Sequence, residues 1–310
     1  MDELLIASHK FFDEPKNLIY QVVRCGRFWG IIRAEGRQMI LEPIKDYTAM
    51  SSAGASILFD EAMRKLSRGE RFNLGLATGN TMITLYAELA AKFNTARADL
   101  SLLSTWNLDE YSLDGKLPVP HDHPLSYWKY MHEMLFSKFD PALGFREENA
   151  HFPDPAAPDV YDPAIAAAGG LDLQLLGIGF NGHIAFNEPM KEDEISVEAF
   201  AKLPTRVLPL SQETIVQNTH VTAGGDSSLV PRYAATMGMV PILAAKKCLL
   251  LACFEEQTAP MNAIIAKGRP TPFLPASYLW NHPDFRLIYT MDKIQLSKLP
   301  QSARNTACGG

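Results

Sequence analysis

A chain of 310 residues is long enough for one large α/β domain or two small ones, and folding buries about three quarters of the unfolded surface of such a chain. Hydrophobic residues make up 47% and charged residues 21%, as in ordinary globular proteins, and a net charge of −6 excludes a general attraction to nucleic acid or anionic lipid. The chain opens without the basic and apolar regions of a signal peptide, and no apolar stretch reaches about 18 residues, so we expect no membrane span.

The four cysteines show neither a C-x-x-C pair nor a metal-ligand spacing. Cys248 and Cys253 lie in an apolar run, which favours a place in the core. Because disulfide bonds are typical of oxidising compartments, this usage of cysteine predicts a protein of the reducing cytoplasm.

The first 38 residues form a separate N-terminal extension in our prediction. Two runs rich in strand-forming residues, 18–23 and 28–32, flank Cys25, Gly26 and Arg27. The pattern indicates a β-hairpin that packs on the main domain or extends its sheet. An extension without fixed structure is the alternative.

From residue 39 to residue 295, strand patterns alternate with helical patterns. Strand patterns lie at 39–44, 72–77, 100–106, 171–177, 206–210, 247–253 and 285–290, and helical spacing of apolar residues marks 46–68, 81–93, 125–136, 212–218 and 258–267. The alternation predicts one α/β domain, with a single doubly wound, mostly parallel, Rossmann-like sheet and helices on both faces. We expect the tail at 296–310 to be flexible.

The segment Thr78-Gly79-Asn80-Thr81 lies between a predicted strand and a predicted helix. Backbone N–H groups at the start of a helix, together with the helix dipole, suit a phosphate or another anion. Gly79 allows the backbone to come close to such a ligand. The side chain of Thr78, Asn80 or Thr81 can also act as an N-cap, and the two interpretations are compatible.

Two acidic residues, Asp109 and Glu110, follow the strand predicted at 100–106 and therefore fall at its carboxyl end. Proton transfer at a substrate carbon requires a carboxylate that lies close to that carbon and is partly shielded from water. The position fits this requirement. A solvated acidic loop is the alternative.

The most informative segment runs from Gly177 to Pro189. It follows a buried-strand pattern, its glycines allow a sharp turn, and it contains His183 and Glu188. Open α/β sheets form their sites from such turns at the carboxyl ends of the strands. A tight turn with a solvated histidine and glutamate is the alternative.

Three segments together resemble the glucosamine-6-phosphate deaminases, also called isomerases, and the related 6-phosphogluconolactonases. They are L-G-L-A-T-G-N-T at 74–81, N-L-D-E-Y at 107–111 with H-P-L-S-Y at 123–127, and G-I-G-F-N-G-H-I-A-F-N-E-P at 177–189. The lactonases share G-x-G-x-[DN]-G-H but continue without I-A-F-N-E-P. The resemblance covers roughly residues 42–293 and leaves residues 1–38 without a counterpart.

The resemblance implies a role for each residue of the last two segments. Asp109 matches the base that moves a proton between C2 and C1 of the open-chain sugar. His183 matches the group that opens the pyranose ring by proton exchange at the ring oxygen, and Glu188 matches the carboxylate that supports it. Asn181 stands where part of the family has aspartate, so it can form hydrogen bonds but cannot relay a proton as a carboxylate does. The implied substrate-binding residues are Thr78, Gly79, Asn80, Thr81, Glu110, Gly179, Gly182 and His220.

The implied reaction converts an amino sugar 6-phosphate, of glucosamine or galactosamine type, to a ketose 6-phosphate and ammonia. Acid–base groups can carry it, so we expect no metal and no organic cofactor. The expected partner is a small sugar phosphate, rather than nucleic acid or a membrane, and the family's habit predicts a homo-oligomer. His121 and His123 supply only two ligands, so we expect no metal site there.

The part of the family pattern that holds the substrate phosphate has changed. Ile215 and His220 stand at two arginine positions of the family's D-T-R-x-x-N-x-R lid pattern, and Thr258 stands at a phosphate-binding lysine. One interpretation is that other cations reach the phosphate. The candidates are Lys202, Arg232 and Lys246. The other interpretation is that the substrate lacks the phosphate or carries it elsewhere.

Regulation and alternative functions follow from the same comparison with the family. Arg206 matches an arginine of the effector site in allosteric members, but Leu208 replaces the lysine that follows it there, which argues against regulation by an acetylated sugar phosphate. A diverged member acting on another sugar, a lactonase-type hydrolase and a non-catalytic sugar-binding protein are the alternatives. The presence of Asp109, His183 and Glu188 favours an enzyme.

Overall fold

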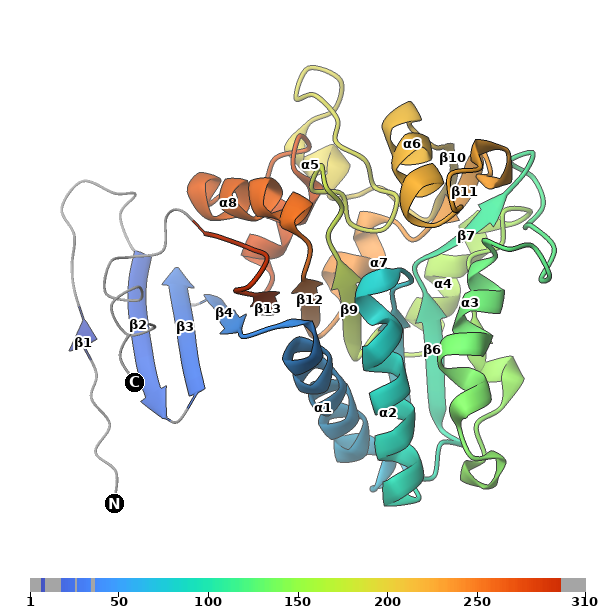
Figure 1. Cartoon of the computed structure of the whole chain (residues 1–310), viewed down its shortest axis with the longest axis horizontal. Coiled ribbons are helices and arrows are strands. Elements are labelled where there is room, and N and C mark those ends of the chain that lie inside the picture. Colours follow the sequence, from blue (N-terminus) through green and yellow to red (C-terminus); the bar gives the residue numbers. More distant parts are fainter. Residues whose placement is uncertain (1–6, 9–17, 26, 35–36, 297–310) are drawn as a thin grey trace.

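The computed structural model describes residues 7–8, 18–25, 27–34 and 37–296 (Figure 1). A large sheet runs through the molecule in the strand order β1-β2-β3-β4-β13-β12-β9-β5-β6-β8. The bounds of these strands are β1 (Ala7–Ser8), β2 (Leu18–Cys25), β3 (Arg27–Ala34), β4 (Arg37–Ile44), β5 (Phe72–Leu76), β6 (Leu103–Asn107), β8 (Ala150–His151), β9 (Leu173–Gly177), β12 (Cys248–Ala252) and β13 (Asp284–Thr290). Of the tail predicted at 296–310, all but Leu296 lies outside the described residues.

Along the strand order, all neighbours from β4 through β13, β12, β9, β5 and β6 to β8 pair in parallel, and the alternation of strands and helices predicted such a parallel sheet. The pairs β1–β2, β2–β3 and β3–β4 are antiparallel and extend the sheet beyond β4. Figure 1 shows these antiparallel strands at one end of the molecule, away from the helices. The extension predicted at 1–38 thus contributes strands to the sheet in the part that is described.

Helices cover both faces of the parallel region. The helices are α1 (Tyr47–Leu66), α2 (Ile83–Ala96), α3 (Tyr127–Met134), α4 (Tyr161–Ala167), α5 (Val197–Phe200), α6 (Gln212–Val221), α7 (Met239–Ala244) and α8 (Thr258–Lys267). In Figure 1, α1 and α2 lie in front of the sheet and α4 and α7 behind it. Every residue of β5, β6 and β12 is buried, as expected for strands covered on both sides.

Local signals explain where α1 begins and how closely it packs. The Asp46 carboxylate accepts a hydrogen bond from the backbone N–H of Ala49 at 2.9 Å and caps the helix. A Cβ atom at Gly54 would lie 2.6 Å from Cδ1 of Leu85 on α2. The absence of a side chain at Gly54 therefore lets α1 and α2 pack against each other at close range.

A second, three-stranded antiparallel sheet was not predicted. It has the order β10 (Arg206–Pro209), β11 (Tyr233–Thr236), β7 (Asp109–Ser112), so the strand expected at 206–210 belongs here and not to the large sheet. The run D-E-Y-S of β7 has no apolar alternation, and the partner strands lie far away in the sequence. The sheet has its own apolar cluster, which consists of Tyr111, Val119, Leu125, Phe186, Leu210, Ile215, Ala223, Val230 and Ala234.

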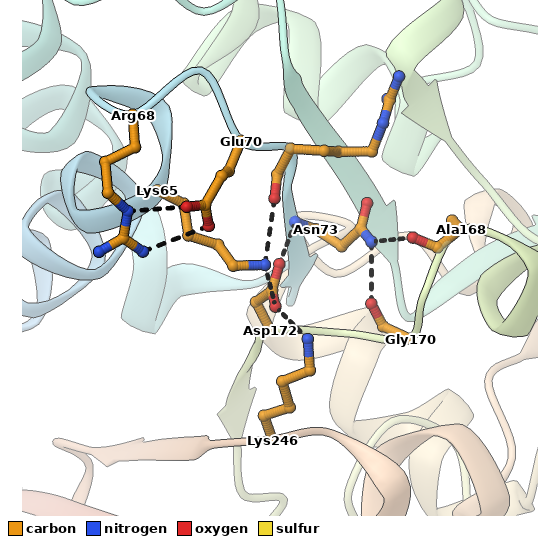
Figure 2. A network of polar contacts seen from close by, with 9 residues as sticks. Lys65, Arg68, Glu70, Asn73, Ala168, Gly170, Asp172 and Lys246 are labelled. Carbon is orange, nitrogen blue, oxygen red and sulfur yellow. Dashed lines mark hydrogen bonds and ion pairs between the residues drawn. The ribbon is translucent and has the colours of Figure 1, made fainter.

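A polar network joins several elements at the amino ends of the parallel strands (Figure 2). The Asp172 carboxylate, 6% exposed, accepts hydrogen bonds from Lys65 at 2.9 Å, from Lys246 at 2.7 Å and from the backbone N–H of Asn73 at 2.9 Å. Lys246 lies two residues before β12. Its side chain is thus at the amino ends of the parallel strands, the edge of the sheet opposite to the glycine-rich segment at 177–189. The interpretation that Lys246 reaches a substrate phosphate is wrong, because its ammonium group pairs with Asp172 at that opposite edge.

Among the helices of the described residues, none combines the length and the apolar character that a membrane span requires.

Candidate active site

Three segments meet around Asp109 at the carboxyl edge of the large sheet. One Asp109 carboxylate oxygen accepts hydrogen bonds from the Thr236 hydroxyl at 2.5 Å and from the backbone N–H of Phe186 at 3.3 Å. The Phe186 N–H also donates to the Thr236 hydroxyl at 3.0 Å. The pairing of β7 with β11 explains the first contact, because Asp109 and Thr236 lie directly opposite each other and so point to the same face.

Burial changes the acidity of Asp109. Its side chain is inside the protein, and the loss of solvation raises the pKa of its carboxyl group to about 7, although the donors Thr236 and Phe186 and the nearby His183 act in the opposite direction. A carboxyl group with a pKa near neutrality can take up and release a proton at physiological pH. Asp109 therefore has the property that a general acid–base catalyst needs.

His183 lies in a polar triad with Glu188 and Asn181. Nδ1 of His183 is 3.5 Å from Oε2 of Glu188, an ion-pair distance rather than a short hydrogen bond. The Asn181 amide donates to the same oxygen at 2.8 Å, and its carbonyl oxygen accepts from the backbone N–H of His183 at 3.1 Å. The structure thus brings together the three residues that the sequence motif predicted.

The charge of Glu188 is stabilised in this triad. Burial disfavours the ionised form, but the neighbouring His183 and hydrogen bonds from Thr214 and Asn181 outweigh it and hold the pKa of Glu188 below its usual range. The Thr214 hydroxyl donates to Oε1 at 2.5 Å. An ionised Glu188 can orient the imidazole of His183.

The glycines of the segment make room for His183. A Cβ atom at Gly179 would lie 2.3 Å from the imidazole ring, and the Gly179 N–H donates to the backbone oxygen of His183 at 3.0 Å. Gly182 has a φ of 88°, and a Cβ atom there would lie 2.3 Å from Cδ1 of Leu274. These contacts show that both glycines shape the turn, and their contact with substrate stays a prediction.

Asn187 fixes the end of this turn and was not predicted as a site residue. Its amide donates to the backbone oxygens of Ile184 at 3.1 Å and Met237 at 2.9 Å, and its side chain is fully buried. Ala185, with a φ of 51°, lies in the left-handed region that favours glycine. Asn187 thus holds a strained segment in the position that directs the Phe186 N–H to Asp109.

The loop at 78–81 leads directly into the 3₁₀ turn Asn80–Met82 and α2. Gly79 has a φ of 126°, and the N-cap residues of the turn and of α2 supply no side-chain cap, although the Tyr47 hydroxyl accepts from the backbone N–H of Thr84 in the first turn of α2 at 3.2 Å. Instead, tyrosine hydroxyls hold backbone oxygens: Tyr130 donates to Gly79 at 2.7 Å and Tyr47 to Asn80 at 3.1 Å. The N-cap interpretation is therefore wrong for this loop, and Thr81 is buried. Thr78, Gly79 and Asn80 retain some exposure.

Glu110 makes contacts of a different kind from those of Asp109. Its carboxylate accepts from the backbone N–H groups of Tyr127 at 3.0 Å and Trp128 at 2.8 Å and from the Ser126 hydroxyl at 3.2 Å. Burial raises the pKa of Glu110 despite these donors. Both oxygens are thus engaged at the start of α3, which indicates that Glu110 positions this helix.

His121 and His123, the pair considered above as metal ligands, have structural contacts. The His121 ring stacks on Trp128 at a centroid distance of 3.8 Å, and Nδ1 of His123 accepts from the backbone N–H of Leu125 at 3.1 Å. No group of three or more potential metal ligands occurs among the residues that the structure describes.

Comparison with known proteins shows the family of the chain. The family model for glucosamine-6-phosphate isomerases/6-phosphogluconolactonase matches residues 45–199. A glucosamine-6-phosphate deaminase of Rhodopirellula baltica is 36% identical over 269 residues, which are 85% of this chain and 97% of the relative. The chain belongs to the glucosamine-6-phosphate isomerase/6-phosphogluconolactonase family. Glucosamine-6-phosphate deaminase 2 of Bacillus subtilis is 40% identical over 215 residues, 67% of this chain and 79% of the relative.

Solved structures of the family confirm the fold. A monomeric glucosamine-6-phosphate deaminase superposes with a TM-score of 0.70 at 28% identity and covers 82% of this chain and 98% of its own. A 6-phosphogluconolactonase of Thermotoga maritima superposes with a TM-score of 0.58 at 18% identity, over 81% of this chain and 99% of its own. The predicted fold class, a mostly parallel α/β sheet with helices on both faces, is therefore confirmed.

The positions that depart from the family pattern lie on α6 and at the start of α8. Ile215 is 5% exposed and packs in the apolar cluster of the small sheet, whereas His220 is exposed near the end of α6. The contacts between α6 and the site come instead from Thr214, which binds Glu188, and from Asn218, which donates to the Tyr111 hydroxyl at 2.9 Å. The role of His220 in substrate binding stays a prediction.

Proposed function

We propose that this protein is an amino-sugar phosphate deaminase that converts an amino sugar 6-phosphate, of glucosamine or galactosamine type, to a ketose 6-phosphate and ammonia. The observation that carries the proposal is the position of Asp109, buried and with a pKa of about 7, in contact with the segment that bears His183 and Glu188. The curated relatives, at 36% and 40% identity, are glucosamine-6-phosphate deaminases, which supports the same activity.

In the proposed mechanism, His183 exchanges the proton at the ring oxygen as the pyranose opens, and Glu188 holds the imidazole in orientation. Asp109 then takes the proton from C2 and returns one to C1, which gives an enolamine and then a ketimine-like centre at C2. Addition of water at C2 releases ammonia and leaves the ketose. The overall balance is one amino sugar phosphate and one water to one ketose phosphate and one ammonia.

Lactonase-type hydrolysis is less well supported. The segment I-A-F-N-E-P, which the lactonase pattern lacks, provides three contacts of this site: the Phe186 N–H to Asp109, the Asn187 amide to the backbone of Met237, and the Glu188 carboxylate beside His183. These contacts assemble the acid–base groups. The solved lactonases are below 20% identity to the chain and support the fold alone.

For the phosphate of the substrate, we propose the loop at 78–81. The N-cap residues at the start of α2 supply no side-chain cap, and helix N-termini attract anions, although the Tyr47 hydroxyl already accepts from the Thr84 N–H at 3.2 Å. Among the alternative cations, Lys202 and Arg232 are exposed, and Lys246 lies at the opposite edge of the sheet. The sugar specificity and the mode of phosphate binding remain part of the proposal.

The test measures ammonia release from glucosamine 6-phosphate, galactosamine 6-phosphate and unphosphorylated glucosamine. For 6-phosphogluconolactone, it measures the acid that hydrolysis produces. We expect ammonia from one or both amino sugar phosphates and none from glucosamine. Hydrolysis of the lactone without ammonia release would replace the proposal with the lactonase function. Turnover of none of the four substrates by folded protein would also reject it.

Three further predictions belong to the proposal. We propose a cytoplasmic location, a homo-oligomeric state and a catalytic domain at 39–295 that functions apart from the extension at 1–38. One solved relative is a monomeric deaminase, so oligomerisation is open to a direct test by light scattering coupled to gel filtration. Deletion of residues 1–38 tests the third prediction through the specific activity of the shortened chain.

A further inference from the structure

Arg206, Thr236 and Asp109 form a row across the small sheet. Arg206 on β10 lies opposite Thr236 on β11, and Thr236 lies opposite Asp109 on β7. Directly opposite residues of antiparallel strands point to the same face, and neighbouring strands are about 4.8 Å apart. The side chain of Arg206 therefore starts on the same face as the catalytic carboxylate, two strands away.

The segment that carries His183 and Glu188 lies on this row and contacts each of its members. The Phe186 N–H donates to Asp109 and to Thr236, and Nη1 of Arg206 donates to the side-chain oxygen of Asn187 at 2.9 Å. Nη1 also donates to the backbone oxygen of Pro204 at 3.3 Å. Consecutive residues of the segment are thus bound to opposite ends of the same row.

The Arg206–Asn187 bond completes the hydrogen bonds of a buried amide. The nitrogen of Asn187 donates to the backbone oxygens of Ile184 and Met237, and its oxygen accepts from Arg206. Loss of the arginine would remove this charged donor from the Asn187 oxygen. Because Asn187 is fully buried, bulk water cannot replace the lost hydrogen bond. Ala185 has a positive φ, so the segment needs such contacts to remain in place.

Arg206 also interacts electrostatically with Asp109. Burial lowers the pKa of the guanidinium, and the charge of Asp109 acts in the opposite direction and raises it. The interaction is mutual, so the guanidinium favours the ionised form of Asp109. The other titratable groups coupled to Asp109 come from β7, from α3, from α4 and from the segment after β9. They are Glu110, Tyr111, Tyr127, Tyr161 and His183.

We propose that Arg206 is a positioning residue of the deaminase site, which holds Asn187 and the His183–Glu188 segment against the small sheet, on the same face as Asp109. The role differs from that of an effector-site arginine, because its partners belong to the catalytic segment of the same chain. The inference rests on the proposed function for its kinetic readout only.

The test compares Arg206→Gln, Arg206→Lys and Arg68→Gln with the unchanged protein. Arg68 is a matched control, since its side chain is 61% exposed and pairs with Glu70 away from the site. For Arg206→Gln we expect kcat to fall about 10- to 100-fold with KM within about threefold, because a misplaced catalytic group reduces the rate of the chemical step. Arg206→Lys restores the charge and part of the rate, and Arg68→Gln changes neither constant.

A second readout does not depend on turnover. Carbon-13 NMR titration of the Asp109 carboxyl group measures its pKa directly, and loss of the opposite charge raises it by roughly half a unit to one unit in Arg206→Gln. The Lys variant and the Arg68 control leave it close to the original value. If the unchanged protein releases no ammonia, the proposed function fails while the titration still decides the role of Arg206.

Two results would overturn the inference. A rise in KM with unchanged kcat would make Arg206 a direct substrate ligand. An unchanged Asp109 pKa in Arg206→Gln, together with unchanged kcat, would reduce Arg206 to a structural residue. Circular dichroism checks the fold of each variant. If Arg206→Gln does not fold, the kcat of Arg206→Lys and the pKa of Asp109 in that variant are measured instead.

Discussion

At the scale of single residues, the chemistry of the site depends on how burial separates the acidities of neighbouring carboxyl groups. Asp109 is buried at 6% exposure and Glu188 is partly buried, with 18% of its side chain exposed; the pKa of Asp109 is raised to about 7 and that of Glu188 is lowered. Both groups have two hydrogen-bond donors and His183 nearby, but burial outweighs these partners at Asp109, whereas the partners outweigh burial at Glu188. One carboxyl group is thus free to exchange protons while the other remains a fixed charge.

The first prediction concerns Asp109 as the proton-transfer base. Asp109→Asn keeps the shape and can accept the bond from the Phe186 N–H, but it cannot take a proton. We expect turnover to fall by at least about 10³-fold while substrate binding and the thermal unfolding midpoint change little. Calorimetric titration with substrate and an ammonia assay measure the two quantities separately. Retention of more than a tenth of the original kcat would exclude Asp109 as the base.

The second prediction is the pH dependence of the same group. Ionised Asp109 is the active form, and its fraction rises with pH through about 7. We therefore expect kcat/KM to rise about tenfold per unit below this value and to level off above it. A pH–rate profile of the unchanged protein measures the inflection. A profile that is flat between pH 5 and pH 8 would contradict the assignment.

The third prediction uses Gly179. In Gly179→Ala the new Cβ atom would lie 2.3 Å from the His183 ring, so the imidazole must move away from its place beside Glu188. We expect kcat to fall by about 10²-fold or more, since small displacements of catalytic groups are costly. Gly169→Ala is a control for loss of a glycine, because nothing lies within 4 Å of its Cβ position, and its φ of 93° adds a backbone strain that Gly179→Ala does not have. Equal activities of Gly179→Ala and Gly169→Ala would show that catalysis does not depend on the position of the His183 ring.

At the scale of elements, α6 is attached to the site by polar contacts at both of its ends. Ser211 caps the helix through the backbone N–H of Thr214, the Thr214 hydroxyl binds Glu188, and Asn218 binds the Tyr111 hydroxyl. Buried Ile215 adds apolar contact. The helix thus contributes to the triad by holding the second oxygen of Glu188.

The fourth prediction tests this attachment. Thr214→Val keeps the volume but removes the donor to Glu188, so the pKa of that carboxyl group rises and its support of His183 weakens. We expect kcat/KM to fall about 3- to 30-fold, in line with the loss of one hydrogen bond to a charged group. Val216→Thr, at an exposed position of the same helix, is the matched control and should leave kinetics unchanged. Identical kinetics for both variants would show that α6 does not act through Glu188.

The elements differ in how far the sequence predicted them. The parallel strands other than the two-residue β8, and the helices α1, α2 and α8, were predicted because each has an apolar pattern with clear ends. The small sheet was missed, since β7 consists of Asp109-Glu110-Tyr111-Ser112 and has no apolar alternation. Thr236 lies 127 residues from Asp109 in sequence, and no local pattern marks that contact. The triad was predicted because all its members lie within one motif. The role of Glu110 at the start of α3 was not predicted, because its contacts with Tyr127 and Trp128 join residues 17 and 18 positions apart.

At the scale of the whole molecule, chemistry and stability lie at opposite edges of the parallel sheet. Acid–base groups lie at the carboxyl ends of the strands, and the network around Asp172 joins α1, β5, β9 and the segment before β12 at the amino ends (Figure 2). Such a division lets the site retain buried, strained groups while the other edge stabilises the sheet.

The last prediction concerns the stability that Asp172 provides. Burial opposes its charge, but hydrogen bonds from Lys246, Asn73 and Lys65 outweigh burial and hold the pKa of Asp172 below its usual range. A carboxyl group with a depressed folded-state pKa stabilises the protein above its unfolded pKa of about 3.9, and this stability is lost as the pH falls through the folded-state value. Asp172→Asn should therefore lower the free energy of unfolding at pH 7 by about 1–2 kcal/mol, a figure reduced for the exposure of Lys246.

Urea unfolding of Asp172→Asn and the unchanged protein at pH 7 and near pH 3 measures this effect. The difference between the two proteins should shrink toward acid pH, because protonated Asp172 resembles asparagine in charge. Glu70→Gln is the control: Glu70 pairs with Arg68 in the same region, but the pair is exposed and should add no measurable stability. Kinetics of ammonia release should be unchanged in both variants, since the network lies at the edge away from Asp109. A stability difference between Asp172→Asn and the unchanged protein that persists undiminished at pH 3 would show that packing at position 172, and not its charge, stabilises the sheet.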